Sequence, residues 1–257
     1  MPVLDLPTRR LHYRIDGDAG PWLLLCNSLG TDLHMWDAQA DALSAHFRVL
    51  RYDRRGHGAS SAPPPPYTLA ELGGDALALL DALGIERAHF CGLSIGGLVG
   101  QWLGIHAGER IDRLVVCATA SRIGTIEGWN ARIAQVRAGG LAPVITATAE
   151  RWFTPGFINA HPDAVDAILA RFAKVSAEAY VGCCAALAGA DLRGDVARIE
   201  RPLLAVSGDD DPVCPPADLQ AIADDVADGR HVSLPGRHIV NIESAAAFNA
   251  ALLAFLG

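Results

Sequence analysis

The residues whose types and spacing are best suited to chemistry are Gly-Leu-Ser-Ile-Gly at positions 92–96. A short apolar run at 88–91 precedes them, and a helix-like run at 97–103 follows. A serine on a tight strand-to-helix turn is held in strained backbone space, and the flanking glycines remove side chains that would collide with the strand or the helix. The pattern therefore predicts that Ser94 presents a nucleophilic hydroxyl at the start of a helix, although a plain turn with these letters also arises by chance.

Two later segments supply the partner groups that a serine nucleophile needs, in the chain order serine, carboxylate, histidine. An apolar run at 202–207 leads into three consecutive carboxylates at 209–211, and the next apolar run leads to His238. Loops at the carboxyl ends of parallel strands meet at one crevice, so these segments can converge. We assign Ser94 as the nucleophile, His238 as the general base and then acid, and Asp211 as the carboxylate that orients the imidazole.

The choice of Asp211 within the acidic segment rests on its position three residues after Gly208, which ends the strand. Asp210 is the alternative. For Asp209 and Asp210, a solvated turn is the simpler interpretation. His238 stands apart from the rest of the nine histidines, because no other follows a late strand after the acidic segment.

A tetrahedral intermediate also needs hydrogen-bond donors for its oxyanion, and backbone amides are expected to supply them. One is the amide of Ile95, directly after the nucleophile. The second is expected from Asn-Ser-Leu-Gly at 27–30, which follows the apolar run at 22–26, with Leu29 as the donor. A further turn, Asp-Arg-Arg-Gly-His-Gly at 53–58, is interpreted as structural.

Length, charge and cysteine usage favour one soluble catalytic domain. The 257 residues can bury a large core, and the formal net charge of −8 argues against nucleic acid or an anionic membrane as a partner. The amino-terminal residues lack a basic and then apolar leader, and no run reaches the length of a membrane span. Six scattered cysteines are typical of free thiols in a reducing compartment, so we expect a cytoplasmic protein. The sequence does not indicate an oligomeric state.

The order of apolar segments predicts an α/β architecture. Strand-like and helix-like segments alternate, which is typical of a mainly parallel sheet with helices on both faces. Between residues 121 and 191 the alternation stops and the pattern is helical throughout. We therefore predict a core of residues 1–120 and 192–257, with residues 121–191 inserted after the sixth strand as a helical cap that excludes water and shapes the pocket.

Taken together, these motifs resemble those of the 3-oxoadipate enol-lactonases, in the α/β-hydrolase superfamily. The resemblance covers nearly the whole chain. It is carried by Asn-Ser-Leu-Gly-Thr-Asp-Leu-His-Met-Trp at 27–36, Arg-Tyr-Asp-Arg-Arg-Gly-His-Gly at 51–58, His-Phe-Cys-Gly-Leu-Ser at 89–94, Gly-Gln-Trp-Leu-Gly at 100–104 and parts of 123–133. One departure is Ile95, where these enzymes often carry methionine. Its amide, and not its side chain, would serve the oxyanion.

The resemblance implies an α/β-hydrolase fold and the hydrolysis of a five-membered enol-lactone that bears a carboxymethyl group. The product would be 3-oxoadipate, formed through an acyl-enzyme in the β-ketoadipate pathway of aromatic (protocatechuate/catechol) degradation. The expected partner is this small anionic lactone. Neither a metal nor an organic cofactor is required by such a mechanism.

The free carboxylate of that substrate needs a cationic partner, and a guanidinium matches a carboxylate in shape. Arg132 is the first candidate, with Trp129 three residues earlier on the same helical face as a wall of the pocket. Arg122 and Arg137 are alternatives. Arg132 as a solvated surface charge and Trp129 as a packing residue are the simpler interpretations.

Two other functions stay open. A general carboxylesterase or a perhydrolase would use the same triad with a different cap and pocket. A non-catalytic ligand receptor on this fold would bind a small molecule without turnover. All three triad residues are present, which favours an enzyme over a receptor.

Overall fold

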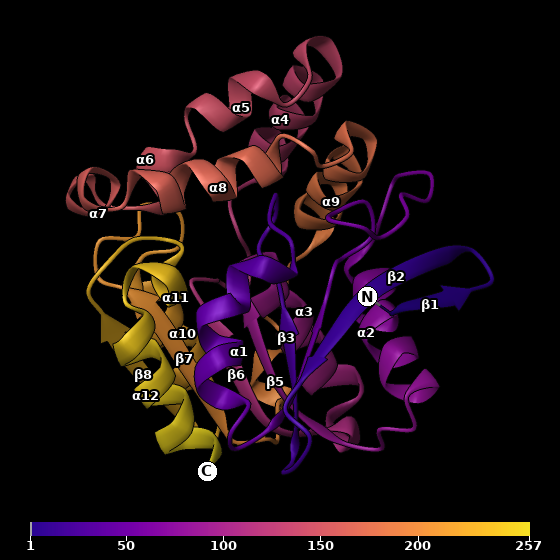
Figure 1. The fold of residues 1–257 in the computed structure, drawn as a ribbon, viewed down its shortest axis with the longest axis vertical. Coiled ribbons are helices and arrows are strands. Elements are labelled where there is room, and N and C mark those ends of the chain that lie inside the picture. The colour runs from indigo at the N-terminus through magenta and orange to yellow at the C-terminus, as the bar shows by residue number, and fades with distance from the viewer. Residues whose placement is uncertain (1) are drawn as a thin grey trace.

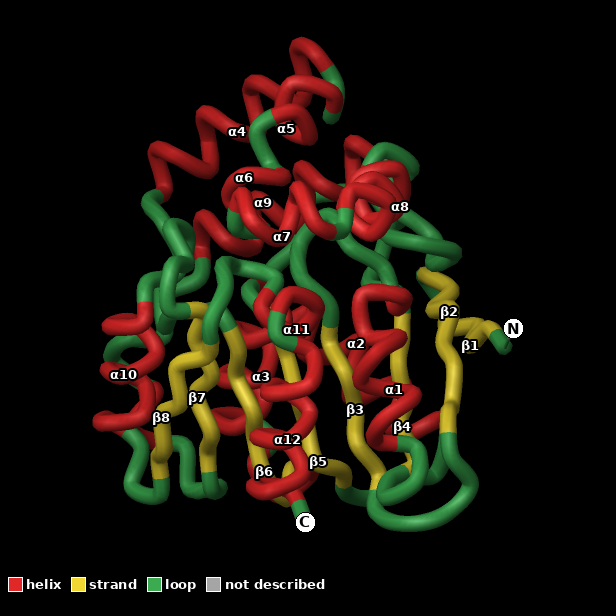
Figure 2. Tube along the Cα trace, turned by 60° about the vertical axis from the view of Figure 1, so that its left-hand side comes forward, coloured by secondary structure: helices red, strands yellow, loops and turns green. Residues whose placement is uncertain are grey.

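A central eight-stranded sheet organises the molecule, seen in a computed structural model that describes residues 2–257 (Figures 1 and 2). The strands are β1 (Val3–Leu6), β2 (Arg9–Asp16), β3 (Trp22–Cys26), β4 (Arg48–Tyr52), β5 (Ala88–Leu93), β6 (Ile111–Cys117), β7 (Leu203–Gly208) and β8 (Gly229–Leu234). Their spatial order is β1-β2-β4-β3-β5-β6-β7-β8. β2 pairs antiparallel with both β1 and β4, and all other neighbours are parallel, which confirms the predicted mainly parallel sheet.

The inner strands are buried along nearly their whole length. Every residue of β5 and of β7 is buried, and β3 and β6 are buried over most of their residues. Strands covered on both faces read as continuous apolar runs, because neither face meets water. This property made the inner strands recognisable in the sequence.

Helices cover both faces of the sheet (Figures 1 and 2). On one face α1 packs against α12 and α11 lies beside α12, whereas on the other α2 packs against α3 and α10 covers β7 and β8. Their bounds are α1 (Asp37–Leu43), α2 (Leu69–Ala82), α3 (Ile95–His106), α10 (Pro216–Asp225), α11 (Val240–Glu243) and α12 (Ala245–Leu256), and the short 3-10 helices are η1 (Leu33–Trp36), η2 (Gly108–Arg110) and η3 (Val196–Arg198).

A second helical layer lies above one end of the sheet (Figure 1). It contains α4 (Ile126–Gly139), α5 (Ala142–Thr146), α6 (Ala149–Trp152), α7 (Pro155–Ala160), α8 (Pro162–Phe172) and α9 (Ala177–Gly189). The chain enters this layer after β6 and leaves it beside its point of entry, where the Leu192 amide donates to the Ser121 carbonyl at 2.8 Å. The layer covers the carboxyl ends of the parallel strands.

The strand order reverses between β3 and β5, since the chain runs from β3 outward to β4 and then crosses back to β5. Crevices form outside the carboxyl ends of strands at such a switch point. The loops after β3 and β5 therefore border one crevice, and the helical layer closes it from above.

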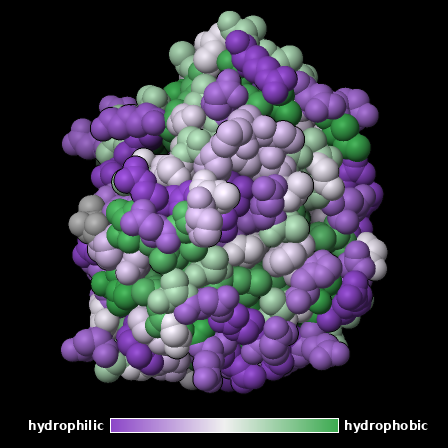
Figure 3. All heavy atoms as spheres, turned by 90° about the vertical axis from the view of Figure 1, so that its right-hand side faces the viewer, coloured by the Kyte–Doolittle hydropathy of each residue, from purple (hydrophilic) through white to green (hydrophobic). Residues whose placement is uncertain are grey.

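The surface shows no continuous apolar face in the view of Figure 3, where hydrophilic side chains are interleaved with small hydrophobic patches. Within residues 2–257, no helix combines the length and the apolar composition needed to cross a membrane. The six cysteines are all buried with free thiols, as expected.

Candidate active site

Ser94 lies on the sharp turn between β5 and α3. Its backbone angles are φ 60° and ψ −120°, a region that costs an ordinary residue steric energy. A Cβ on Gly92 would lie 2.1 Å from the Gly96 carbonyl oxygen, and one on Gly96 would lie 2.3 Å from the Cys26 carbonyl oxygen. Both glycines are therefore required, because the turn passes close to its own backbone and to the end of β3.

The strained turn is held by hydrogen bonds to the neighbouring strand. The Ser94 amide donates to the Cys117 carbonyl at 2.9 Å, and the Thr119 hydroxyl donates to the Ser94 carbonyl at 2.8 Å. These contacts fix the backbone on both sides of the Ser94 side chain. The hydroxyl is thereby presented to the crevice from a rigid support, which is what a nucleophile requires.

The loops after β7 and β8 bring Asp211 and His238 together. The His238 Nδ1 and Asp211 Oδ2 atoms are 2.9 Å apart, and both residues are buried. The other Asp211 oxygen accepts from the Val213 and Cys214 amides at 2.7 and 3.2 Å. These bonds hold the carboxylate in one orientation against the imidazole.

The other two carboxylates of the acidic segment point elsewhere. Asp210 forms an exposed ion pair with Arg237 at 2.7 Å, and Asp209 accepts from the Gly236 amide at 2.9 Å. Both therefore hold the neighbouring loop in place. The structure thus brings Asp211, and not Asp210, to the imidazole of His238.

Ser94 and His238 line the same cavity. Among the described residues no hydrogen bond joins the two side chains, and such catalytic hydrogen bonds often tighten only around bound substrate. The Ile239 amide donates to the Trp152 carbonyl at 3.1 Å, so the segment that carries His238 is tied to α6. The helical layer therefore helps to position the imidazole.

The two expected oxyanion donors border this cavity as well. Leu29 lines it, and Ile95 is the first residue of α3, where an amide has no partner inside the helix. Within the described part of the chain neither amide donates to another group. Both amides are therefore available to an oxyanion.

The turn at 53–58 supports the loop that carries Leu29. The Gly30 amide donates to His57 Nε2 at 3.1 Å, and the other ring nitrogen of His57 is 3.1 Å from the Arg55 carbonyl. Burial, and then the charge of Arg54, lowers the pKa of His57 to about 3. The ring is therefore neutral near pH 7 and can accept through Nε2, which agrees with the structural interpretation of this turn.

The roof of the cavity comes from the helical layer. Trp129 and Arg132 on α4 line it together with Trp152 on α6. The rings of Trp152 and Phe172 stack at 5.7 Å, and the indole nitrogen of Trp129 donates to the Ile123 carbonyl at 2.6 Å. The cavity is small, about 90 Å³, so it suits a compact substrate.

Two arginines face this cavity. Arg132 Nη1 lies 3.4 Å from the Tyr180 hydroxyl, and Arg151 donates to the Thr148 hydroxyl at 3.3 Å. Burial, and then the charge of Arg132, lowers the pKa of Arg151. Within residues 2–257 neither arginine forms an ion pair with a carboxylate. The site thus holds two guanidinium groups that are available to an anion.

The sequence analysis named Arg132 but not Arg151, since nothing in the sequence around residue 151 distinguishes it from other helix arginines. The two alternative arginines that the sequence offered, Arg122 and Arg137, lie outside the cavity. Arg122 pairs with Asp191 at 3.3 Å, and Arg137 is exposed. Only the docking of α6 onto the His238 segment brings Arg151 into the site.

Comparisons with known proteins show the family of this chain. Residues 21–143 match the alpha/beta hydrolase fold family. The chain is 45% identical to 3-oxoadipate enol-lactonase 2 of Acinetobacter baylyi over 96% of this chain and 92% of the relative. The chain belongs to the α/β-hydrolase family, in the group of the enol-lactonases. It is a hydrolase.

Two more relatives support the assignment of this hydrolase to the group of the enol-lactonases. A second A. baylyi protein, 3-oxoadipate enol-lactonase 1, is 39% identical over 91% of this chain and 88% of its own. The crystal structure of the enol-lactonase from Burkholderia xenovorans LB400 is 44% identical, has a TM-score of 0.97 and covers 99% of each chain. The predicted α/β-hydrolase fold is therefore confirmed.

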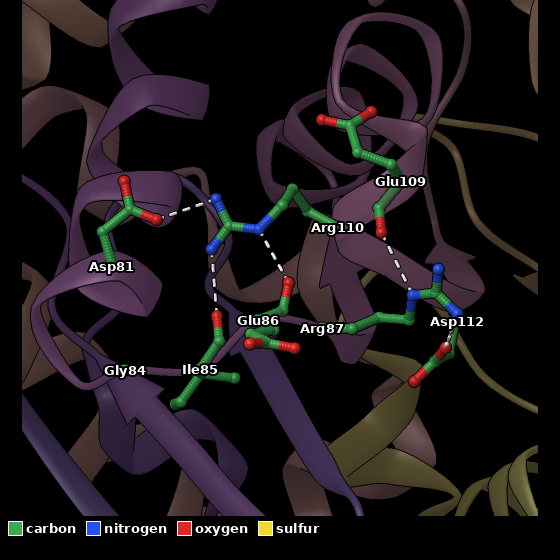
Figure 4. A pocket seen from close by; sticks show the side chains of 8 residues that line it. All are labelled: Asp81, Gly84, Ile85, Glu86, Arg87, Glu109, Arg110 and Asp112. Carbon is green, nitrogen blue, oxygen red and sulfur yellow. Dashed lines mark hydrogen bonds and ion pairs between the residues drawn. The ribbon is translucent and has the colours of Figure 1, made fainter.

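A larger surface groove of the hydrolase, about 900 Å³, lies at the opposite end of the sheet, where β5 and β6 begin (Figure 4). Its arginines are already paired. Arg110 contacts Asp81 at 2.7 Å, and Arg87 contacts Asp112 at 3.3 Å. Among the described residues that line the groove there is no serine, cysteine or histidine and no arginine without a carboxylate partner, so the chemistry is assigned to the smaller cavity.

One group of side chains in the described chain has the spacing of a metal site. The ligand atoms of Asp211, Cys214 and His238 lie within 4.8 Å of one another. Burial raises the pKa of the Cys214 thiol well above its usual range. Asp211 and His238 are bonded to each other in this group, as expected for a triad.

Proposed function

We propose that this hydrolase opens the ring of 3-oxoadipate enol-lactone to give 3-oxoadipate, a step of the β-ketoadipate pathway of aromatic degradation. The observation that carries the proposal is the cavity that joins Ser94 and His238 to Arg132 and Arg151. A neutral ester gains nothing from two guanidinium groups that have no carboxylate partner in the protein. An anionic lactone can pair its free carboxylate with them. The 45% identity to an enol-lactonase supports the same substrate.

In the proposed mechanism Ser94 Oγ attacks the lactone carbonyl while His238 takes its proton. The Leu29 and Ile95 amides bind the resulting oxyanion, and Asp211 stabilises the imidazolium. The ring C–O bond then breaks, and the ring oxygen leaves as an enol that receives the proton from His238. An enol leaves more readily than an alcohol, so the demand on His238 as an acid is modest.

The acyl-enzyme is resolved by the same groups. His238 deprotonates a water molecule, whose oxygen attacks the acyl carbonyl, and the same two amides bind the second oxyanion. Collapse returns the proton to Ser94 Oγ and releases a carboxylate. The enol that was formed in the first step becomes the ketone of 3-oxoadipate.

Arg132 and Arg151 are proposed to hold the carboxymethyl group of the substrate, with Trp129 as a wall. Both guanidinium groups line the cavity, and each is only partly exposed. An ion pair in such a site is less screened than one in water, which makes it effective in orienting the ring toward Ser94.

Residues 121–191 are proposed to form the cap, inserted into a core of residues 1–120 and 192–257. The Leu192–Ser121 hydrogen bond lies at the base of this insertion, and the insertion supplies Trp129, Arg132 and Arg151. The cap would therefore exclude water and select the substrate, while the core supplies the nucleophile, acid and base.

The function is tested by the loss of the ultraviolet absorbance of the enol-lactone when purified protein is added. Rapid loss well above the spontaneous rate is expected. No loss above background, together with hydrolysis of neutral aryl esters, would replace the lactonase by a carboxylesterase, and peroxide-dependent turnover would indicate a perhydrolase. A single burst of acylation without turnover would indicate a receptor.

Removal of either cavity arginine is expected to weaken binding of the lactone. Arg132→Ala and Arg151→Ala should each raise KM for the lactone by about tenfold to a hundredfold, because a partly buried ion pair is lost. Hydrolysis of an uncharged aryl ester should be nearly unchanged. Arg122→Ala is the matched control, since Arg122 pairs with Asp191 outside the cavity. An equal loss on lactone and ester would contradict the carboxylate-binding role.

A further inference from the structure

Arg54 lies behind the loop that carries the oxyanion donor Leu29. Its side chain is 1% exposed. Its Nη2 atom donates to the carbonyl oxygens of Asn27 and Ser28, and the bond to Ser28 is 3.2 Å long. A guanidinium from the turn after β4 is thus buried against the backbone of the loop after β3.

Within the described residues, Arg54 forms no ion pair with a carboxylate. In residues 2–257 its Nε and Nη1 atoms have no hydrogen-bond partner. Other buried arginines of the hydrolase are paired: Arg55 binds Asp75 through two bonds of 2.7 and 2.8 Å, and Arg51 binds two carboxylates. A buried charge without a counter-ion destabilises a fold. The guanidinium of Arg54 beside the oxyanion loop therefore suggests a functional role.

The neighbours of Arg54 do not neutralise it. Burial raises the pKa of the neighbouring Cys26 and Cys183 thiols, although the charge of Arg54 acts to lower both, so neither thiol supplies a counter-ion. His57 is neutral as well, because its pKa is lowered. Within the described residues, Arg54 therefore places a guanidinium without a carboxylate partner behind the loop.

The Ser28 carbonyl, which Arg54 contacts, belongs to the same peptide group as the Leu29 amide. This Ser28 carbonyl also accepts from the Thr31 hydroxyl at 2.9 Å and the Thr31 amide at 3.4 Å. In a trans peptide the C=O and N–H bonds point in opposite directions. Donors at the carbonyl polarise the peptide, which strengthens its N–H as a donor on the other side.

We propose that Arg54 is a positioning residue that strengthens the oxyanion hole through the Ser28–Leu29 peptide. The guanidinium orients this peptide and polarises it, and its charge offsets part of the negative charge that develops on the oxyanion. The inference rests on the proposed Ser94 chemistry, but it does not depend on the lactone being the substrate.

The test compares Arg54→Gln and Arg54→Lys with wild type on two substrates, the enol-lactone and the uncharged ester p-nitrophenyl acetate. Acylation and deacylation both pass through an oxyanion, so kcat of Arg54→Gln should fall by about tenfold to a hundredfold on both substrates, with KM for the ester within about twofold. Arg54→Lys keeps the charge with fewer donors, and a smaller loss is expected.

Arg51→Gln is the matched control. Arg51 is also 1% exposed, but it pairs with Asp16 and Asp37 at 2.8 and 2.6 Å away from the cavity. This variant should lower the thermal midpoint and leave kcat unchanged. Arg51→Gln thus shows the effect of losing a buried arginine on stability alone. Arg54→Gln is expected to lower kcat in addition.

A second readout isolates the oxyanion. A phenylboronic acid forms a tetrahedral adduct with Ser94 that places a boron-bound oxygen in the oxyanion hole, so its inhibition constant for Arg54→Gln should rise by the same factor as kcat falls. A folded Arg54→Gln that keeps its kcat on the ester would overturn the proposal, as would an effect confined to KM for the lactone. If Arg54→Gln does not fold, the uncharged Arg54→Met takes its place, and wild-type kcat and boronate affinity in that variant would overturn the proposal.

The two proposals can fail separately. Wild-type protein that is inactive on the lactone but hydrolyses the ester, with Ser94→Ala inactive, would reject the substrate and leave the Arg54 comparison valid. Activity on the lactone with an ester kcat that does not respond to Arg54 would reject only the Arg54 proposal.

Discussion

Ser94→Ala is expected to lower kcat for the lactone by at least about 10⁴-fold, since removal of a triad nucleophile leaves only the contribution of binding and the oxyanion hole. The strained φ of 60° at this position persists in the variant, because the turn is fixed by its backbone hydrogen bonds and not by the hydroxyl. The measurement is the rate of absorbance loss at equal concentrations of wild-type and variant protein.

Ser207→Ala serves as the control for this substitution. Ser207 is also a buried serine, at the end of β7, but its hydroxyl contacts His231 at 2.9 Å and does not line the cavity. Its kcat should stay within a few-fold of wild type. Retention of most activity by Ser94→Ala would exclude serine catalysis and redirect the mechanism toward direct attack of water.

Asp211→Asn is expected to lower kcat by about 10³-fold to 10⁴-fold with little change in KM. The amide of asparagine carries no charge to stabilise the imidazolium, and it can donate to Nδ1 of His238, which favours the wrong tautomer. Because Asp211 is 4% exposed, water cannot replace the lost carboxylate easily. Steady-state kinetics on the lactone measures the effect.

Asp210→Asn is the neighbouring control, since it removes one carboxylate from the same segment. Its ion pair with Arg237 is exposed, so its loss should change stability by less than about 1 kcal/mol and kcat by less than about twofold. The reverse outcome, a large loss in Asp210→Asn and a small one in Asp211→Asn, would move the acid to Asp210.

The sequence alone was sufficient to predict the fold and the segments that make up the site. Strands buried on both faces must be continuous apolar runs, and a nucleophile on a tight turn needs glycines beside it. Both features depend on residues that are adjacent in the sequence, so a local pattern reveals them. The confirmed parallel sheet and the positions of Ser94, Asp211 and His238 after their strands follow from such local rules.

Contacts between distant segments were decided only by the tertiary structure. The spacing after Gly208 had already favoured Asp211 over Asp210, but the contact of its carboxylate with the imidazole is made by the packing of the loops after β7 and β8. Arg151 enters the cavity because α6 docks on the His238 segment. Arg54 appeared in the sequence only as part of a turn, and its carbonyl contacts arise from the packing of that turn on the loop after β3. The direction in which such side chains point depends on how whole helices, strands and loops pack together. A local sequence pattern does not determine this packing.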